Sequence, residues 1–304
     1  MGVAILTILI SHIGNFSGVR YFTPLGPLGV SLFLMVSGYG LSESFNDAGL
    51  KDFFRKRARR VLLPYWIVLL FYVALSFLIR LHLSAGQIAS YVVLWELPTG
   101  MYWYLQFIIF WYISFFICCR VIPAIRYRIA ALFAVSVLVL IISNEQLITE
   151  QAFFFPLGAM LSFKKAYLEN LLQRKKTAIV SGVGLGMISL TFLILKQLPP
   201  VRAELSSLYS YLLIQIPMLI GGSLAIMVGV DKIIPFKYFR LTDFLGKYCY
   251  EIYLTHAILL HFLMPKNAFL GISGILILVS LLLSLLLKRL VDLMVNYREV
   301  SFGQ

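Results

Sequence analysis

Two histidines lie inside long apolar stretches of the sequence, where an ionisable side chain needs a cavity or a polar partner. His12 lies in the first apolar stretch, and His256 lies near the C-terminal end with Glu251 five residues before it. Helical rise places His12 about 17 Å from Met1, near the middle of a bilayer. An imidazole at this depth can act as a base, or it can hydrogen-bond a neighbouring helix. The residues alone leave both roles open for His12, and they make His256 and Glu251 candidates to line a cavity.

A basic cluster follows the second apolar stretch. Six of the ten residues from 51 to 60 are Lys or Arg, and Arg57 and Arg60 are three apart, so they share one face of a helix. Guanidinium groups bind phosphate oxygens in pairs. The pair is therefore predicted to hold the phosphates of a nucleotide-like cofactor. The alternative is a stop-transfer anchor or a contact with anionic lipid.

Ser37 lies beside two glycines, Gly38 and Gly40, within an apolar stretch. Small residues let transmembrane helices approach closely, so helix packing is the simpler interpretation of this segment. The sequence contains no G-x-S-x-G elbow, no metal-ligand spacing and no phosphate-binding glycine loop. Ser37 shows no sign of being a nucleophile, so beside helix packing its possible role is to line a cavity, and no metal is expected.

Three aromatic residues, Tyr39, Trp103 and Tyr104, complete the set of candidate site residues. Their rings could stack on adenine or on a sugar in the cavity. They could equally belong to the aromatic belts that sit at membrane interfaces.

The composition requires a lipid environment around these residues. Of the 304 residues, 61% are hydrophobic and 13% are charged, and the mean hydropathy is +0.91. An ordinary soluble domain is only about 45–50% apolar. The apolar stretches are unbroken rather than alternating, which indicates transmembrane helices rather than the strands of a closed barrel. The predicted fold is an all-α polytopic helix bundle.

Ten apolar runs have, or nearly have, the roughly 17–25 residues that one span needs. They cover residues 1–18, 25–42, 61–80, 101–119, 128–143, 148–163, 177–195, 207–230, 248–264 and 268–288. If the loop from 43 to 60 is cytosolic, nearly all of the 26 Lys and Arg residues fall on that side, as the positive-inside rule requires. The exceptions are Arg20, Arg80, Lys196, Arg202 and Lys266. This distribution predicts ten spans with both termini cytosolic, and it explains the net charge of +13 without nucleic acid as a partner.

The order of these features resembles the membrane acyltransferase-3 family. Five segments carry the resemblance, and they extend from about residue 1 to 288: the first run with His12, LFLMVSGYGLSESF, FFRKRARRVLLPYW, MYWYL at 101–105, and GKYCYEIYLTHAILL with His256. The resemblance implies a ten-span enzyme that takes an acyl group, usually acetyl, from cytosolic acyl-CoA. It passes this group to a hydroxyl on an extracytoplasmic acceptor, as in O-acetylation of surface polysaccharides.

The same resemblance implies that His12 is the catalytic base and that Arg57 and Arg60 engage the acyl donor. The family's first span carries an Arg, ten residues and then the His, and Met1 stands at the Arg position here. Residues 1–304 are expected to form a single integral-membrane acyltransferase domain. Either its first span is truncated at the N-terminus, or this member of the family lacks the Arg.

The resemblance thus implies an O-acyltransferase of the cell envelope, in a bacterial inner or plasma membrane, with acetyl-CoA or another acyl-CoA as donor. Its expected partners are the acyl-CoA, a glycan or other hydroxylated acceptor, and membrane lipid. Two alternatives remain open: a transporter or flippase for a lipid-linked sugar, and a purely structural membrane subunit. A transporter would show inverted repeats and matched broken helices, and the sequence shows no such symmetry.

Overall fold

The computed structural model describes residues 1–205, 207–232, 239–263 and 270–301, and all regular structure in these ranges is helical. The predicted all-α, polytopic helix bundle is therefore confirmed. The last residue of the ninth run, Met264, and the first residue of the tenth run, Ala268, lie outside the described residues. Lys237 and Lys266 of the charge pattern also lie outside them.

Each of the ten apolar runs contains a helix. In chain order these are α1 (Gly2–Phe16), α2 (Leu25–Ala48), α4 (Leu63–Leu78), α6 (Trp103–Val121), α7 (Ile125–Ile142), α9 (Phe154–Phe163), α11 (Lys175–Gln197), α13 (Leu208–Lys232), α15 (Cys249–Leu263) and α16 (Leu270–Ser301). The connecting elements are η1 (Arg20–Phe22), α3 (Phe53–Arg57), η2 (Ala58–Leu62), α5 (Ala85–Val92), η3 (Gly100–Tyr102), α8 (Gln146–Thr149), α10 (Lys165–Gln173), α12 (Pro199–Glu204) and α14 (Phe239–Lys247).

Seven helical stretches in the described residues are long and apolar enough to cross a membrane, judged by length and composition. Two further apolar helices, α1 and α15, are shorter. The sixth run differs from a continuous span, because it contains the end of α8, a turn and the ten residues of α9. The chain is therefore a multi-pass membrane protein, while ten crossings stay a prediction.

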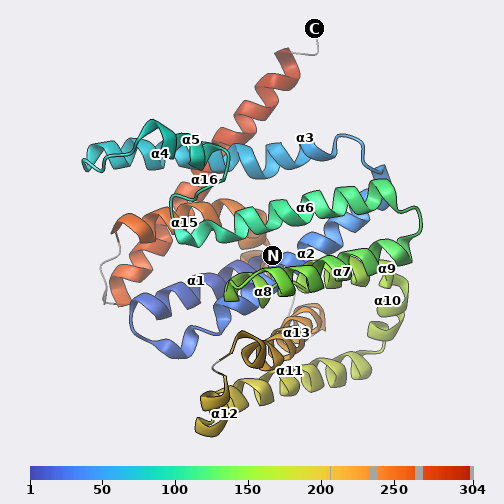
Figure 1. Cartoon of the computed structure of the whole chain (residues 1–304). Coiled ribbons are helices and arrows are strands. Elements are labelled where there is room, and N and C mark those ends of the chain that lie inside the picture. The colour runs from blue at the N-terminus through green and yellow to red at the C-terminus, as the bar shows by residue number, and fades with distance from the viewer. Residues whose placement is uncertain (206, 233–238, 264–269, 302–304) are drawn as a thin grey trace.

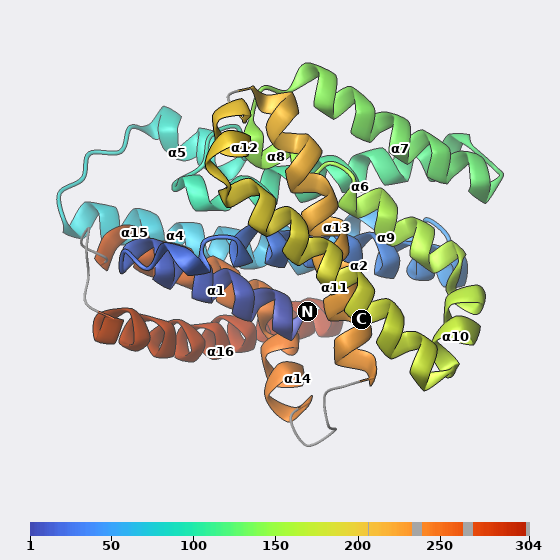
Figure 2. The same ribbon diagram turned by 90° about the horizontal axis from the view of Figure 1, so that it is seen from below.

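The centre of the bundle is formed by α1 and α2. In Figure 1 the pair lies between α11 and α13 at one edge and α4 and α5 at the other. Figure 2 shows the same pair between α7 and α16. Helix α1 packs against α2, α14, α15 and α16. His12 on α1 is therefore held in the interior of the bundle.

Helices α2 and α9 pack with their backbones in close contact. A Cβ added to Gly158 would collide with the carbonyl oxygen of Met35, and a Cβ added to Gly38 would collide with that of Phe155. Glycine at both positions permits this approach. By contrast, a Cβ at Gly40 would meet no atom within 4 Å. The two neighbouring glycines of the sequence motif thus differ, because Gly38 packs and Gly40 faces open space.

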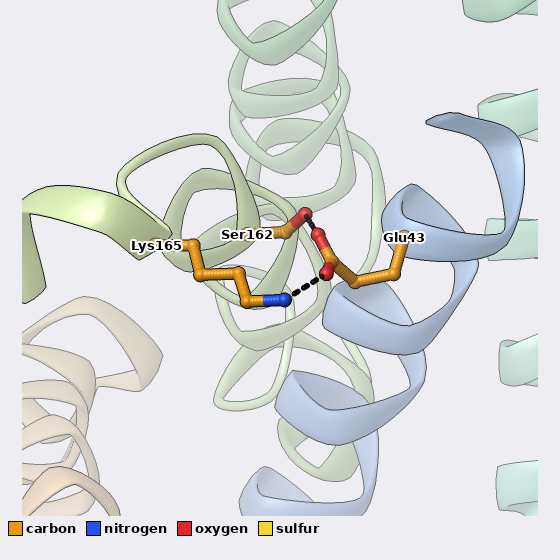
Figure 3. Close-up of polar contacts among 3 residues, drawn as sticks. All are labelled: Glu43, Ser162 and Lys165. Atoms are coloured by element: carbon orange, nitrogen blue, oxygen red, sulfur yellow. Dashed lines mark hydrogen bonds and ion pairs between the residues drawn. The ribbon is translucent and has the colours of Figure 1, made fainter. Parts of the chain in front are cut away.

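A polar cluster joins the C-terminal part of α2 to the junction of α9 and α10 (Figure 3). The Glu43 carboxylate accepts hydrogen bonds from the Ser162 hydroxyl at 2.6 Å and from the Lys165 ammonium at 2.8 Å. The bond from Lys165 to Glu43 raises the pKa of Lys165. This cluster fastens the end of α2 that follows Ser37 and Gly40.

Candidate active site

Arg57 and Arg60 line one cavity, of about 370 Å³ and here called the arginine cavity, together with Met1 at the start of α1. Arg57 is the last residue of α3, and Arg60 lies in the π-helical η2. Single π-helical turns inside α-helices are frequent at functional sites. The structure thus brings the two arginines of the sequence motif to the same cavity.

The guanidinium of Arg57 is half-buried between aromatic rings. Its Cζ atom lies 5.5 Å from the ring centroid of Tyr112 and 5.7 Å from that of Phe53. The buried Nε of Arg57 has no hydrogen-bond partner among the described residues. Arg60 is exposed. The Arg57 guanidinium also interacts with the Tyr112 hydroxyl. A partly buried guanidinium with one unsatisfied nitrogen, beside an exposed guanidinium, is suited to bind an anionic group that enters from the open side.

Tyrosines form much of the remaining wall of the arginine cavity. Besides Tyr112, the wall includes Ser37, Tyr104, Tyr250 and Tyr253. The Tyr250 hydroxyl donates to the carbonyl oxygen of Val61 at 2.9 Å, which ties α15 to η2. The Tyr253 hydroxyl donates to the carbonyl oxygen of Met101 at 2.6 Å, which ties α15 to η3. These bonds fix the wall relative to the two arginines.

His12 lines a second cavity, of about 700 Å³, here called the histidine cavity. Ser11 and Asn15 of the same helix share this lining, as does Trp103 at the start of α6. Met1, the residue directly before α1, and His12, on α1, line different cavities. The two cavities therefore lie toward opposite ends of α1.

Part of the histidine cavity is polar. Lys196 donates hydrogen bonds to Gln215 Oε1 at 2.8 Å and to the Tyr211 hydroxyl at 3.2 Å, and Tyr211 donates to Glu150 Oε2 at 2.9 Å. These four residues and Arg202 all belong to the cavity lining. The sequence reasoning missed this network, although Glu150 is an ionisable residue inside an apolar run and Lys196 directly follows another.

Aromatic rings connect the two cavities. The ring centroids of His12 and His256 lie 5.3 Å apart, those of His256 and Tyr253 5.8 Å, and those of Tyr253 and Tyr104 5.7 Å. Tyr253 and His256 are three residues apart on α15, so they face the same side of the helix. The sequence analysis missed Tyr253, although this spacing was visible in the segment that contains His256.

The structure divides the remaining candidate residues between several places. Trp103 lines the histidine cavity, and Ser37 and Tyr104 line the arginine cavity. Tyr39, Glu251 and His256 are not among the described residues that line these two cavities, and His256 instead borders a separate small void together with His12. Tyr39 lies one helical turn before Glu43 of the polar cluster, and Glu251 is buried with a carboxylate oxygen 3.9 Å from the Lys288 ammonium.

The site combines a cationic cavity, a cavity with an imidazole, and aromatic rings between them. An imidazole can remove a proton from a hydroxyl, and guanidinium groups can hold phosphates. The described residues contain no cluster of three or more His, Cys, Asp or Glu side chains that could hold a metal ion.

Comparison with known proteins gives the class of chemistry. The model of the acyltransferase 3 family, described as an acyltransferase domain, matches residues 2–289, which is nearly the whole chain. No curated protein and no solved structure matches the chain. The match covers every candidate site residue, and it covers all residues that line the two cavities except Met1. The chain therefore belongs to the acyltransferase 3 family and is a membrane-bound acyltransferase.

Proposed function

We propose that the protein transfers an acyl group, in the first place acetyl, from acyl-CoA to a hydroxyl of a cell-surface or exported glycan, with His12 as the base. The observation that carries this proposal is the separation of the two cavities along α1, with Arg57 and Arg60 at one and His12 at the other. A donor that arrives on one side of the membrane and an acceptor on the other could then meet at the boundary between the cavities.

The donor side is proposed to be the arginine cavity. In the orientation that the loop charges favour, with both termini cytosolic, this cavity faces the compartment that contains acyl-CoA. Its volume of about 370 Å³ is small for a whole coenzyme. The cavity would therefore hold the acyl-pantetheine arm, while the nucleotide phosphates bind at Arg57 and the exposed Arg60.

The acceptor side is proposed to be the histidine cavity. Its polar network offers a carboxylate, an amide and an ammonium to the hydroxyls of a sugar, and Trp103 offers a ring face for stacking. Pockets that bind sugars need such hydrogen-bonding groups because each buried hydroxyl loses its water.

The chemistry balances with these groups alone. The acceptor hydroxyl oxygen attacks the thioester carbonyl carbon while His12 removes the hydroxyl proton. The new C–O bond forms, the C–S bond breaks, and the departing thiolate takes the proton from His12 to give free CoA. A base positioned in this way accelerates such a step by roughly 10²–10⁴-fold.

The test is a His12→Ala substitution in cells whose surface glycan is then analysed for O-acetyl groups. We expect O-acetylation to be lost while the amount of protein in the membrane and its binding of acetyl-CoA are unchanged. His82, which is exposed and lies outside both cavities, provides the matched control as His82→Ala. O-acetylation that persists in the His12→Ala cells would remove His12 from the mechanism.

A further inference from the structure

His256 has a ring orientation that is fixed by its own helix. Its side chain is 2% exposed, and Nδ1 lies 2.9 Å from the carbonyl oxygen of Ile252, one turn earlier on α15. A carbonyl oxygen can only accept a hydrogen bond, so Nδ1 must carry the proton. In the neutral ring, Nε2 is then the nitrogen with a free lone pair.

This lone pair is buried without a partner. Nε2 of His256 has no hydrogen bond within the described part of the chain. A buried polar atom without a partner is unfavourable, so such atoms in native proteins usually serve a function or bind an ordered water. The unsatisfied Nε2 of His256 therefore needs a hydrogen-bond donor close to it.

His12 is positioned to supply this donor. Its ring centroid lies 5.3 Å from that of His256, and both rings border a void of about 10 Å³. The other residues around this void are all apolar: Leu9, Ile13, Leu259, Leu260, Leu276 and Ile277. A void of roughly this size holds at most one water molecule. The imidazole of His12 is thus the one polar side chain that shares this void with Nε2 among the described residues.

We propose that His256 is a positioning residue for His12, and that its Nε2 accepts a hydrogen bond from the N–H of His12, directly or through one water in the void. This inference rests on the proposed role of His12 as base. The bond selects the tautomer and the ring orientation of His12, so that its other nitrogen, the one with the lone pair, faces the histidine cavity. The orienting partner of a catalytic histidine in a hydrolase triad acts in the same way.

The hydrogen bond between His12 and His256 also stabilises His12 after it has taken the proton of the acceptor hydroxyl. When His12 takes the proton of the acceptor hydroxyl, both of its nitrogens become donors. The bond to His256 is then charge-assisted and stronger. His256 thus stabilises the imidazolium of His12 until the departing thiolate removes its proton, and His256 itself needs no contact with substrate.

Three substitutions separate this role from packing. A glutamine side chain reaches the position of Nε2 with an oxygen that can accept, whereas asparagine reaches only the position of Nδ1, and phenylalanine keeps the ring without nitrogen. Transfer is measured as release of CoA from acetyl-CoA by the purified protein in liposomes, with a glycan fraction of the source cells as acceptor.

We expect His256→Gln to retain most of the wild-type kcat, and His256→Asn and His256→Phe to lose roughly 10-fold or more of it, a part of what a positioned base contributes. The KM for acetyl-CoA should stay unchanged in all three variants. Equal kcat values for Gln and Asn, or wild-type kcat in Phe, would overturn the proposal. If the Phe variant does not fold, the comparison of Gln with Asn still decides.

The His12→Ala background distinguishes failure of this inference from failure of the proposed function. If the wild-type protein transfers no acetyl to the glycan fraction, the proposed function fails, and if His12→Ala retains full transfer, the proposed role of His12 as base fails. If His12→Ala is inactive but all His256 variants resemble the wild type, only the role of His256 fails. If His12 is the base and His256 positions it, adding His256→Asn to His12→Ala lowers the residual rate no further, because the effects of substituting residues that act as a unit are not additive.

Ring-nitrogen NMR of the wild-type site provides a test that needs no change at His256. The chain contains four histidines, and the exposed His82 and His261 can be replaced by glutamine to leave only the pair. We expect His256 to be protonated at Nδ1 and to have a hydrogen-bonded Nε2. A proton on Nε2 of the neutral ring would contradict the proposal.

Discussion

Trp103 and Tyr104 are neighbours in the chain, yet their side chains line different cavities, Trp103 with His12 and Tyr104 with the two arginines. The start of α6 therefore forms part of the wall between the cavities. Tyr253 completes this wall, because its ring lies 5.7 Å from that of Tyr104 and its hydroxyl is bound to the backbone of Met101. An acyl group held beside the arginines is thus separated from His12 by aromatic rings rather than by a thick layer of protein.

Replacing Arg57 or Arg60 by glutamine should weaken binding of acetyl-CoA. A hydrogen bond to a charged group contributes about 1.5–3 kcal/mol, so each substitution should raise the Kd roughly 10- to 100-fold. Isothermal titration of the purified protein with acetyl-CoA measures this change. Arg55→Gln is the control, since Arg55 is exposed on the same segment and is not part of the cavity lining. An equal effect of Arg55→Gln would favour a general role of the cluster in binding anionic lipid.

Replacing Gly40 by leucine should block the arginine cavity without disturbing the fold. Gly40 lines this cavity, and a Cβ there would meet no atom within 4 Å, so a larger side chain can extend into the open space. We expect acetyl-CoA binding to be lost while the Tm of the detergent-solubilised protein stays unchanged. Gly40→Ala, which adds only a methyl group, should bind almost normally. Normal binding by Gly40→Leu would show that the donor binds elsewhere.

Replacing Gly38 by alanine should destabilise the fold, in contrast to Gly40→Leu. The added Cβ would collide with the carbonyl oxygen of Phe155, and the backbones of α2 and α9 would have to separate. Overpacking of this kind destabilises proteins by about 1–3 kcal/mol or more, which should appear as a lower Tm. Gly184→Ala on the exposed side of α11 is the control, because its Cβ meets nothing within 4 Å. An unchanged Tm in Gly38→Ala would mean that the two helices are not tightly packed.

The sequence predicted the features that depend on composition and on helical periodicity. The apolar runs located the helices, and the spacing of Arg57 and Arg60 predicted that they share one face of a helix, from which both line the same cavity. The lining of the histidine cavity could not be predicted in the same way. Its network joins Glu150, Lys196 and Gln215, which lie on separate segments, and only the packing of those segments brings them together.

The sixth run shows a limit of hydropathy as a guide to continuous helices. Residues 148–163 are apolar enough to suggest one short span, yet the chain turns between α8 and α9. The buried side chain of Gln151 stabilises the turn, because its amide donates to the carbonyl oxygen of Pro27 at 3.0 Å and accepts from the Ser31 hydroxyl at 2.9 Å. Both partners belong to α2, so the local sequence alone contains no signal for this turn.

The proposed orientation can be measured with cysteine labelling in whole cells. Arg202 and Lys175 lie near opposite ends of α11, and both are exposed. After replacement of Cys118, Cys119 and Cys249 by serine, a cysteine at 202 should react with a membrane-impermeant maleimide in intact cells. A cysteine at 175 should react only after the membrane is permeabilised. The reverse pattern would place the arginine cavity outside and would remove the access of cytosolic acyl-CoA to it.

Replacing Lys196 by glutamine should impair use of the acceptor but not binding of the donor. Lys196 lines the histidine cavity, where its ammonium donates to Gln215 and to the Tyr211 hydroxyl that contacts Glu150. Losing one charged hydrogen bond to an acceptor sugar should raise the KM for the glycan by roughly 10-fold. The Kd for acetyl-CoA should stay at the wild-type value, because Lys196 does not line the arginine cavity.

Lys175→Gln is the matched control for this measurement. Lys175 has the same side chain on the same helix, but it lies at the opposite end and lines neither cavity. Transfer rates measured over a range of glycan concentrations should therefore be unchanged in Lys175→Gln. If Lys196→Gln instead raises the Kd for acetyl-CoA and leaves the KM for the glycan unaltered, the assignment of donor and acceptor to the two cavities must be exchanged.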